Sequence, residues 1–331
     1  MSRPLIAITG ATGFVGGFLL QQLHDDNRFD IRALTRRPQP AFPNLEWVAG
    51  DLADPSALRK LVENADIVVH LAGLIKARSK ADFFSVNRDA TGVLVKSAFA
   101  AGATGFLHLS SLAARHPDLS DYAASKRAGE ALALSNAAEY TVGRVLNLRA
   151  PAVYGPGDDE TLKLFKPLRW GIAPIPQGSD RVAMIHVEDL ASAIIACVDE
   201  LLTDRENAKV QPIEKKDKFR GYDHIDIDDG TADGHDLQTL YALVAETLGR
   251  RPRYVKIPRT VLSIAAILNT FAARIGRKAP ILTLGKVNEI CFPDWRAKSP
   301  HLRELINWQP RHTLADALPI VIAAYVTDGR L

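Results

Sequence analysis

A tyrosine and a lysine four residues apart are the side chains in this sequence whose spacing best suits proton transfer. Tyr122 and Lys126 stand in a stretch with helical spacing, which puts both on one helix face, one turn apart. A free phenol has a pKa of about 10, and a neighbouring ammonium group favours the phenolate. Ser111 adds a hydroxyl at the end of an apolar run, where it could hold the same substrate oxygen. These three residues predict proton exchange with an alcohol or carbonyl oxygen during hydride transfer to or from a nicotinamide.

A glycine-rich segment near the N-terminus is typical of a turn that binds a dinucleotide. Residues 9–16 (TGATGFVG) stand directly between an apolar run and a helical pattern. Glycines allow a sharp turn close to a pyrophosphate, which the amide groups at a helix N-terminus can bind. The alternative for this segment is a tight turn that binds no ligand. A Tyr-x-x-x-Lys pair by itself also occurs by chance in many helices. Together the two motifs favour a cofactor site, with predicted contacts at Gly10, Thr12, Gly13, Phe14, Val15 and Gly16.

The end of the second apolar run indicates which dinucleotide this site prefers. An NAD site usually has an Asp or Glu there, which binds the ribose 2′-hydroxyl. This chain instead has Arg36 and Arg37, and a guanidinium can hydrogen-bond a 2′-phosphate. The alternative is that both arginines end a strand in solvent. We therefore predict NADP, with Arg36 as the first contact and Arg37 as the second, and keep NAD as the alternative.

The elements that must position these residues alternate between short apolar runs and amphipathic stretches. Continuous apolar runs are typical of parallel strands that are covered on both faces. Strand–helix–strand repetition of this kind predicts a doubly wound α/β sheet with right-handed crossovers. The expected strands are 5–8, 31–34, 67–71, 106–109 and 141–148, and the expected helices are 14–24, 56–63, 86–101 and 122–140.

Composition and charge exclude several classes of protein. A chain of 331 residues with 47% hydrophobic and 24% charged residues can build a full core, which excludes intrinsic disorder. The 41 Lys and Arg against 38 Asp and Glu leave a formal charge of +3, too small to predict nucleic-acid binding. Two cysteines cannot form a disulfide framework, and no apolar run reaches the roughly 20 residues that span a bilayer. We expect a cytoplasmic protein without an integral membrane segment, whose partner is a small-molecule substrate.

These motifs, taken in order, identify a family. The chain resembles the extended short-chain dehydrogenase/reductases, the NAD(P)-dependent epimerase/dehydratase-like group, across nearly its whole length. The matching segments include the glycine turn, the Ser110–Ser111 pair, the Tyr122 and Lys126 motif and the run RAPAVYGPGD at 149–158. The others are residues 51–52, 70–73, 86–87 and 186–190.

The resemblance implies a role for each matching residue. Tyr122 would be the general acid and base, Lys126 its pKa partner and a ribose ligand, and Ser111 the donor to the substrate oxygen. Relatives in this family commonly dimerise through a helix pair that would here include residues 122–140, which is consistent with a homodimer. For the cofactor, the resemblance implies that Asp51 and Leu52 flank the adenine, Ala72 and Gly73 line its middle, Asn87 braces the sheet, and Pro151 and Tyr154 border the nicotinamide.

The second half of the chain changes character. Residues 150–179 are rich in proline and glycine, which predicts mostly loop. Helices are expected at 185–201 and 237–248, a solvated loop at 203–220, a strand at 225–227, and mostly helix after residue 251. We therefore predict a Rossmann-type domain of residues 1–155, to which 183–230 return, and a smaller, mostly helical substrate-binding lobe of 156–182 and 231–331.

Two further patterns are open to a functional or a structural interpretation. Histidines and aspartates between 224 and 235 resemble a metal cluster, but ordinary turn chemistry explains them and no metal site is predicted. His186 is expected to be structural or to anchor a loop. Residues 261–273 are apolar nearly all round, which favours burial in a core or an oligomer interface. The functional alternative for that segment is a hydrophobic wall for a lipid-like substrate, or shallow membrane docking.

The predicted function is an NAD(P)-dependent oxidoreductase. Its substrate is the secondary alcohol or ketone of a medium-sized, fairly apolar molecule. One alternative is a nucleotide-sugar epimerase that retains its cofactor, although the short interval between Ser111 and Tyr122 leaves little chain for a loop over a bulky substrate. The other alternative is a catalytically silent dinucleotide-binding scaffold or redox sensor.

Overall fold

A seven-stranded parallel sheet forms the larger part of the molecule. The computed structural model describes residues 3–140, 143–210, 223–298 and 301–331. The strands lie in the order β11-β6-β5-β4-β1-β2-β3, and every neighbouring pair is parallel. Their bounds are β1 Leu5–Thr9, β2 Asp30–Thr35, β3 Leu45–Ala49, β4 Ile67–His70, β5 Gly105–Ser111, β6 Arg144–Ala150 and β11 His224–Asp226.

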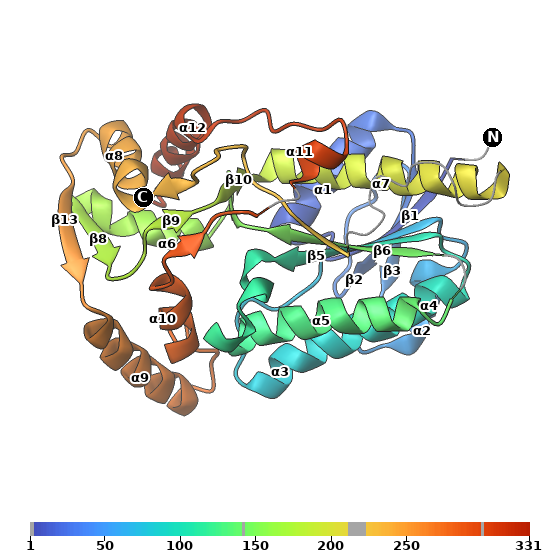
Figure 1. Cartoon of the computed structure of the whole chain (residues 1–331), viewed down its shortest axis with the longest axis horizontal. Coiled ribbons are helices and arrows are strands. Elements are labelled where there is room, and N and C mark those ends of the chain that lie inside the picture. Colours follow the sequence, from blue (N-terminus) through green and yellow to red (C-terminus); the bar gives the residue numbers. More distant parts are fainter. Residues whose placement is uncertain (1–2, 141–142, 211–222, 299–300) are drawn as a thin grey trace.

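Helices cover both faces of this sheet, as Figure 1 shows. One face packs against α1 (Phe14–Asp26) and α7 (Val187–Val210), and the other against α2 (Pro55–Val62), α4 (Ala90–Ala100) and α5 (Asp121–Ala137). The two hydrophobic cores lie between the sheet and these helices, since β1 sends Ile6 and Ile8 to one side and Ala7 to the other. The predicted α/β fold, a doubly wound parallel sheet, is confirmed.

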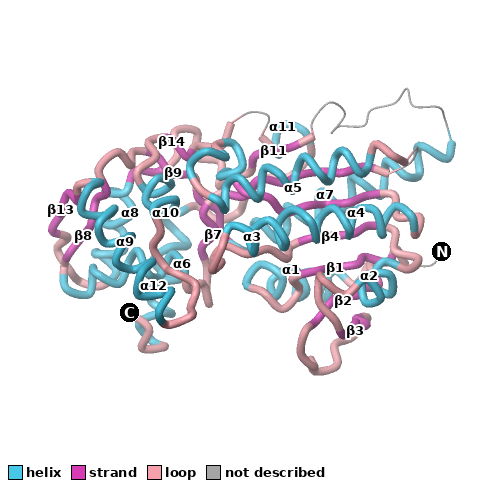
Figure 2. The backbone as a smooth tube through the Cα atoms, turned by 90° about the horizontal axis from the view of Figure 1, so that it is seen from below, coloured by secondary structure: helices cyan, strands magenta, loops and turns pink. Residues whose placement is uncertain are grey.

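The remaining elements form a second group at one end of the sheet (Figure 2). Their own core contains Phe165, Tyr241 and Leu318. Small sheets pair β10 with β7, β13 with β8, and β9 with β12 and β14. The elements are β7 Ala152–Tyr154, α6 Glu160–Phe165, β8 Ile172–Pro176, β9 Arg181–Val182, β10 Met184–His186, β12 His235–Asp236, α8 Leu237–Thr247, β13 Arg253–Ile257, α9 Arg259–Ile275, α10 Leu284–Ile290, β14 Asp294–Trp295 and α12 Leu314–Thr327. The short helix α11 (Leu302–Leu305) packs instead into the core of the large sheet.

The structure corrects three expectations for individual elements. Residues 150–179 are not mostly loop, because β7, α6, a 3₁₀ helix (Lys166–Trp170) and β8 lie within them. Each of these strands pairs with a partner far along the chain, as Ile172 does with Arg253, so a local pattern could not show the pairing. Helix α7 continues to Val210, into the expected loop at 203–220, of which residues 211–220 lie outside the description. Strands β3 and β13 were also missed.

The expected strand at 141–148 begins at Arg144 in the structure, and residues 141–142 are not described. Within the described ranges, no helix combines the length and the apolar character that crossing a membrane requires. The apolar stretch at 261–273 forms most of α9, and Ala266 is its one buried residue. The expected burial of this stretch is therefore wrong for the single chain.

Candidate active site

The carboxyl ends of β1 and β4 mark the place where the strand order reverses. From β1 the chain builds outward through β2 and β3, and then returns to β4 on the other side. Loops at such a point separate and leave a crevice, which is where open α/β sheets bind dinucleotides. The glycine turn follows β1 directly, so the structure places the predicted cofactor residues at this crevice.

Two glycines in the turn are required by close backbone contacts. Gly10 has a φ of +76°, and a Cβ atom there would lie 2.6 Å from the amide nitrogen of Ala72. A Cβ atom at Gly16 would lie 2.2 Å from the carbonyl oxygen of Gly10. The Gly13 amide donates to that same oxygen at 3.0 Å and closes the turn. The turn can therefore lie against both α1 and the loop after β4 only without side chains at these positions.

The first turn of α1 has the donors that a pyrophosphate needs. Gly13 is the N-cap residue, and no side chain hydrogen-bonds to the free amides of this helix end. Thr12 and Gly13 are exposed, whereas Phe14 and Val15 are half-buried. Because glycine leaves the amides open and the helix dipole favours an anion, this end fits the phosphates of a dinucleotide.

The loop after β4 is held in place by Asn87, which is buried. Its Oδ1 accepts from the Leu74 amide at 2.8 Å, and its Nδ2 donates to the Leu74 carbonyl at 2.9 Å. The same amide group donates to Ser125 Oγ at 2.9 Å on α5. Asn87 thus ties the segment with Ala72 and Gly73 to the helix that carries Tyr122.

The ends of β2 and β3 present the predicted adenine side of the crevice. Arg36 and Arg37 are exposed immediately after β2, and within the described ranges their guanidinium groups form no hydrogen bond or ion pair. Asp51 and Leu52 follow β3, and Asp51 Oδ1 accepts from the Ala53 amide at 2.8 Å. Both arginines are therefore available to an anion at this edge.

Ser110 and Ser111 end β5 on opposite sides of the strand. Ser110 donates to Glu130 Oε1 at 2.6 Å, and Arg149 forms a bidentate ion pair with the same carboxylate at 2.6 and 2.7 Å. All three groups are buried. Ser111 is half-buried, and its Oγ accepts from the Ala113 amide at 3.2 Å. The Ser110 hydroxyl is thus engaged in a structural network, and Ser111 is the serine that the site can use.

Tyr122 lies in the first turn of α5, half-buried beside Ser111. Burial raises its pKa to about 12, although a hydrogen bond with Ser111 lowers it, and the negative charge of Glu289 raises it further. The hydrogen bond joins two members of the predicted set. The Lys126 ammonium group contacts the Leu109 carbonyl oxygen and His108, and the expected stabilisation of the phenolate by Lys126 stays a prediction.

Lys126 is buried one turn along α5, where its ammonium group contacts β5. Nζ donates to the Leu109 carbonyl oxygen at 2.7 Å and to His108 Nε2 at 3.4 Å. Burial lowers the pKa of Lys126 to about 8, and the nearby Glu130 carboxylate raises it. A Cβ atom at Gly73 would lie 3.8 Å from Nζ. The ammonium therefore lies beside the segment that the resemblance assigns to the middle of the cofactor.

His108 is a residue at this site to which the sequence analysis gave no role. Its Nδ1 bonds to Asn147 Oδ1 at 2.8 Å, and the Asn147 amide nitrogen donates to the Asp223 carbonyl oxygen. Since that amide oxygen only accepts, Nδ1 carries the proton and Nε2 is free to accept from Lys126. Burial and the Lys126 charge lower the His108 pKa well below its usual value. In the sequence, only the position of His108 three residues before Ser111 could have pointed to a role at this site.

Pro151 and Tyr154 do not share one environment. Pro151 is half-buried at the end of β6, but Tyr154 is fully buried in the core of the second group of elements. Tyr154 packs against the ring of His186, with 5.3 Å between the ring centroids. Its expected place beside the nicotinamide stays a prediction.

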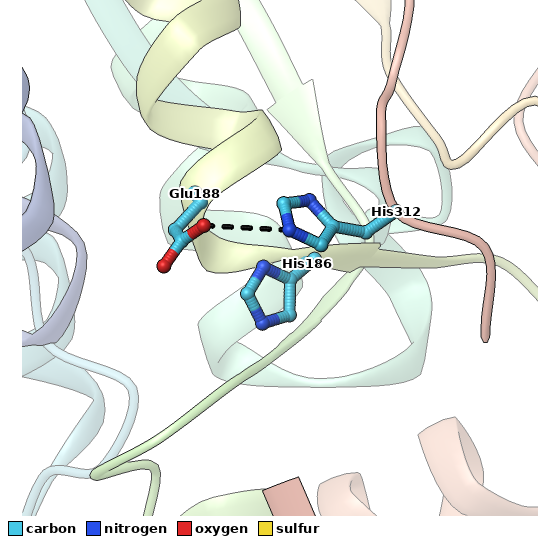
Figure 3. A group of neighbouring side chains, drawn as sticks. All are labelled: His186, Glu188 and His312. Atoms are coloured by element: carbon cyan, nitrogen blue, oxygen red, sulfur yellow. Dashed lines mark ion pairs between the residues drawn. The ribbon is translucent and has the colours of Figure 1, made fainter. Parts of the chain in front are cut away.

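His186 belongs to a cluster of three side chains that Figure 3 shows. Its ring lies 4.2 Å from the ring of His312, and His312 Nε2 pairs with Glu188 Oε2 at 3.4 Å. Ligand-type atoms of these three residues lie within 4.8 Å of one another. His312 also bonds to the buried Asp189 at 3.0 Å. The cluster fastens the chain before α12 to the start of α7.

A cavity of about 480 Å³ lies between residues 74–86, after β4, and residues 277–279, after α9. Lys76, Arg78 and Arg277 are basic lining residues, and Asp82 is an acidic one. Phe83 stands in the chain between the lining residues Asp82 and Ser85, and its ring lies 6.0 Å from the ring of Tyr122. The segment that carries Phe83 therefore separates this cavity from Tyr122.

Comparison with known proteins agrees with this geometry. Residues 6–210 match the model of the NAD dependent epimerase/dehydratase family. This match covers the glycine turn, the serine pair, Tyr122 and Lys126. The chain belongs to that family. The resemblance stated from the sequence is confirmed, and the protein is a member of an NAD-dependent family of oxidoreductases and epimerases.

Several family members are similar over long stretches. The ceramide reductase of Caulobacter vibrioides is 36% identical over 311 residues, which are 92% of this chain and 89% of that protein. The UDP-glucose 4-epimerase of Vibrio cholerae is 25% identical over 59% of this chain and 66% of its own.

Two solved structures share the fold. MoeE5 in complex with UDP-glucuronic acid and NAD has a TM-score of 0.70 at 22% identity, covering 98% of this chain and 99% of its own. The crystal structure of gox2253 has a TM-score of 0.71 at 20% identity over both whole chains. At these identities the two structures bear on the fold and not on the substrate.

Proposed function

We propose that this protein is an NADP-preferring reductase for the ketone of a long-chain, ceramide-like lipid. The observation that carries the proposal is the extent of the likeness to a ceramide reductase, which reaches beyond the cofactor-binding half and includes nearly all of the second group of elements. The UDP-glucose 4-epimerase matches only 59% of this chain. Substrate choice in this arrangement depends on the second group of elements, so the longer match is the more informative one.

The chain between Ser111 and Tyr122 also supports a substrate other than a nucleotide sugar. It holds only two short 3₁₀ turns, Leu112–Arg115 and Pro117–Leu119, before α5 begins. No extended loop is present there to cover a bulky polar ligand. The open side of the site leads instead toward residues 277–279 and α9.

The three catalytic residues have separate roles in this proposal. Ser111 and Tyr122 hydrogen-bond the carbonyl oxygen, which polarises the bond to carbon. When bound, the dinucleotide would supply the hydride that adds to that carbon. Tyr122 would pass its phenol proton to the oxygen, so that the product is a secondary alcohol. Lys126, cationic below its pKa of about 8, stabilises the phenolate that remains. A proton from solvent restores the phenol, so that each cycle consumes one hydride and one proton.

The crevice fits a dinucleotide, and its edge favours the phosphorylated form. The uncapped N-terminus of α1 and the glycine turn would hold the pyrophosphate, with Gly10, Thr12, Gly13, Phe14, Val15 and Gly16 around it. At the other end, Arg36 and Arg37 are exposed where an NAD enzyme would have an acid. We assign Arg36 as the first contact of the 2′-phosphate and Arg37 as the second, with Asp51 and Leu52 beside the adenine.

Steady-state turnover, measured with a keto lipid and with nucleotide sugars, tests the function. We expect NADPH oxidation with the 3-keto form of an N-acyl long-chain amino alcohol in detergent, and the corresponding alcohol as product. UDP-glucose and UDP-galactose should not interconvert, and the purified protein should release little dinucleotide on denaturation. Epimerisation together with a tightly retained cofactor would replace the proposal by the epimerase alternative. Binding of NADPH without turnover of any of these compounds would favour the scaffold alternative.

A further inference from the structure

Helix α9 has an apolar face that nothing in the described chain covers. Six large side chains along it are between 53% and 73% exposed, namely Val261, Ile264, Ile267, Leu268, Phe271 and Ile275. Five of them follow one another at intervals of three and four residues, so they form one continuous stripe. The opposite side is attached to α10 through a small core of Ala266, Val287 and Cys291. A stripe of this size on the outside of a folded chain marks an interaction surface.

The charge around this stripe has one sign. Residues 249–288 contain nine Lys and Arg and no Asp or Glu, although the whole chain has a formal charge of only +3. Arg274, Arg277 and Lys278 at the C-terminal end of α9 are all exposed. An exposed apolar face with basic flanks is the arrangement of helices that lie in the interface of an anionic bilayer.

Helix α9 lies at the border of the molecule, where its apolar stripe can contact a flat surface such as a bilayer. Figure 1 shows α9 along the lower left border of the molecule, with α10 on its inner side. The helix has 17 residues, too few and too charged at its ends to span a bilayer, but it can lie in the plane of the headgroups. A second copy of this chain would bring the same basic residues face to face, so like charges oppose a symmetric dimer through this face.

The same segment leads to the catalytic residues. Arg277 and Ala279 follow α9 and line the cavity together with Asp82 and Ser85. Phe83 stands between those two residues in the chain, and its ring lies 6.0 Å from the ring of Tyr122. Helix α10 contacts the start of α5, since Asn288 donates to the Leu119 carbonyl oxygen at 3.0 Å. The N-cap residue of α5, Ser120, hydrogen-bonds to Glu289. A lipid that enters along the inner edge of α9 therefore reaches the cavity without crossing the rest of the molecule.

We propose that α9 docks the protein on the surface of anionic lipid bilayers, with its apolar stripe among the acyl chains and its basic flanks on the headgroups. Docking places the mouth of the cavity at the membrane, where an apolar long-chain substrate resides. The docking stands by itself on the exposed stripe and its charge, and only the link to the substrate rests on the proposed function.

Vesicle flotation of the purified full chain tests the docking without any substrate. The probes are vesicles of phosphatidylcholine with phosphatidylglycerol, and vesicles of phosphatidylcholine alone. We expect binding to the mixed vesicles that weakens as salt is raised, because the Debye length shrinks from about 10 Å at 0.1 M to about 3 Å at 1 M. Absence of binding to both compositions would overturn the proposal.

Paired variants assign the binding to α9. Phe271→Asp combined with Ile264→Asp should reduce partitioning by at least about tenfold for each side chain withdrawn from the bilayer. Ile320→Asp on α12 is the matched control, since Ile320 is 69% exposed but lies outside the basic segment. Arg274→Glu with Lys278→Glu should also reduce binding, whereas Arg59→Glu with Lys60→Glu on α2 should not. Equal losses in the test and control pairs would contradict the assignment to α9.

Two further measurements distinguish membrane docking from self-association through α9 and test its link to the proposed function. Sedimentation velocity of the wild type and of the Phe271→Asp variant measures self-association, and a dimer that this substitution dissociates would show that a second copy covers the stripe. If the proposed function holds, the Ile264 and Phe271 double variant should keep its turnover with a short-chain keto substrate in solution and lose turnover with the long-chain substrate in vesicles. Failure of the wild type to turn over either substrate, while the wild type still binds vesicles, would reject the proposed function and leave the docking intact.

Discussion

The two serines that end β5 show how a single residue position sets the chemistry. Ser110 is buried and donates to Glu130, which Arg149 also holds. Ser111, one residue on, points to the other side of the strand and bonds with Tyr122. A one-residue shift of β5 would exchange the two environments, so the pairing of β5 with β6 decides which hydroxyl lies beside Tyr122.

Replacing Tyr122 by phenylalanine tests the proton donor. We expect turnover to fall by about 10²–10⁴-fold, because a positioned acid supplies that factor, with nearly unchanged affinity for NADPH. Tyr140→Phe is the control, since that hydroxyl bonds only to the Lys96 carbonyl oxygen near the far end of α5. Turnover of the Tyr122 variant above about a tenth of the wild-type value would exclude the phenol as the acid.

Replacing Lys126 by methionine tests the pairing through pH dependence. The oxidation of the alcohol needs the phenolate, so its rate rises with pH up to the kinetic pKa of Tyr122. Without the ammonium group the phenolate loses its stabilising charge, and the rising limb should move to higher pH. NADPH affinity should also fall, because Nζ lies beside Gly73 in the crevice.

Lys96→Met serves as the control for Lys126, because Lys96 is an exposed lysine whose partner is Glu139. An unchanged pH–rate profile together with unchanged cofactor affinity would show that Lys126 serves neither the phenol nor the ribose.

Replacing Arg36 by aspartate tests the cofactor preference. A hydrogen bond to a charged group contributes roughly 1.5–3 kcal/mol, or about a tenfold to hundredfold preference for NADPH. The carboxylate should reverse this preference, since it repels the 2′-phosphate and accepts from a free 2′-hydroxyl. Calorimetric titration with NADPH and NADH measures it, with Arg59→Asp on the exposed side of α2 as a control of equal charge change. Tighter binding of NADH by the wild type would mean that Arg36 stays in solvent.

At the scale of elements, the site depends on how closely α1 approaches the loop that follows β1. Gly16 and Gly17 are neighbours in this helix, but their surroundings differ completely. A Cβ atom at Gly16 would lie 2.2 Å from the Gly10 carbonyl oxygen, whereas one at Gly17 would meet nothing within 4 Å. The first glycine is needed for packing and the second is not.

The two glycines form a matched pair for alanine substitution. Gly16→Ala should destabilise the protein by about 1–3 kcal/mol and weaken NADPH binding, because backbone atoms must move apart. Gly17→Ala should leave binding unchanged and add up to about 1 kcal/mol of stability, since alanine favours the helix more than glycine does. Urea unfolding and calorimetry measure both effects. A similar response of the two variants would contradict the close contact at Gly16.

At the scale of the whole molecule, one buried carboxylate connects the middle of the chain to the segment before its last helix. Asp189 at the start of α7 accepts from the amides of Arg311 and His312 at 3.0 and 2.9 Å, and from His312 Nδ1. Trp308 packs nearby in the core of the sheet and donates to Ser192. The segment before α12 is thereby fixed to the helix that covers the sheet.

Substitution of Asp189 should therefore affect the stability of the whole protein. Asp189→Ala leaves two backbone amides without an acceptor, which should lower the free energy of unfolding by roughly 2–3 kcal/mol. Asp189→Asn keeps one acceptor oxygen and should lower the free energy of unfolding by less. Glu188→Ala is the control, because Glu188 is partly exposed and pairs only with the His312 ring. A loss for Asp189→Ala no larger than that control would show that the fastening is not needed for stability.

The sequence by itself determined the α/β alternation and the cofactor crevice. Continuous apolar runs, the turn at residues 9–16 and the Tyr122 and Lys126 spacing are local patterns, and local patterns carry this information because strands, turns and helix faces form among neighbours in the chain. The family could be identified from the same motifs. The elements that were missed or misjudged, β3, β7, β8 and β13, are short strands whose partners lie elsewhere.

Only the tertiary structure decided the remaining features of the site. It separated Ser110 from Ser111, placed His108 against Lys126 and buried Tyr154 against His186, because each depends on a neighbour that is distant in sequence. It also exposed α9. An apolar stripe has the same sequence whether it faces a core, a second copy or a bilayer, since hydrophobicity has no direction. The packing of α9 against α10 is what turned the stripe outward.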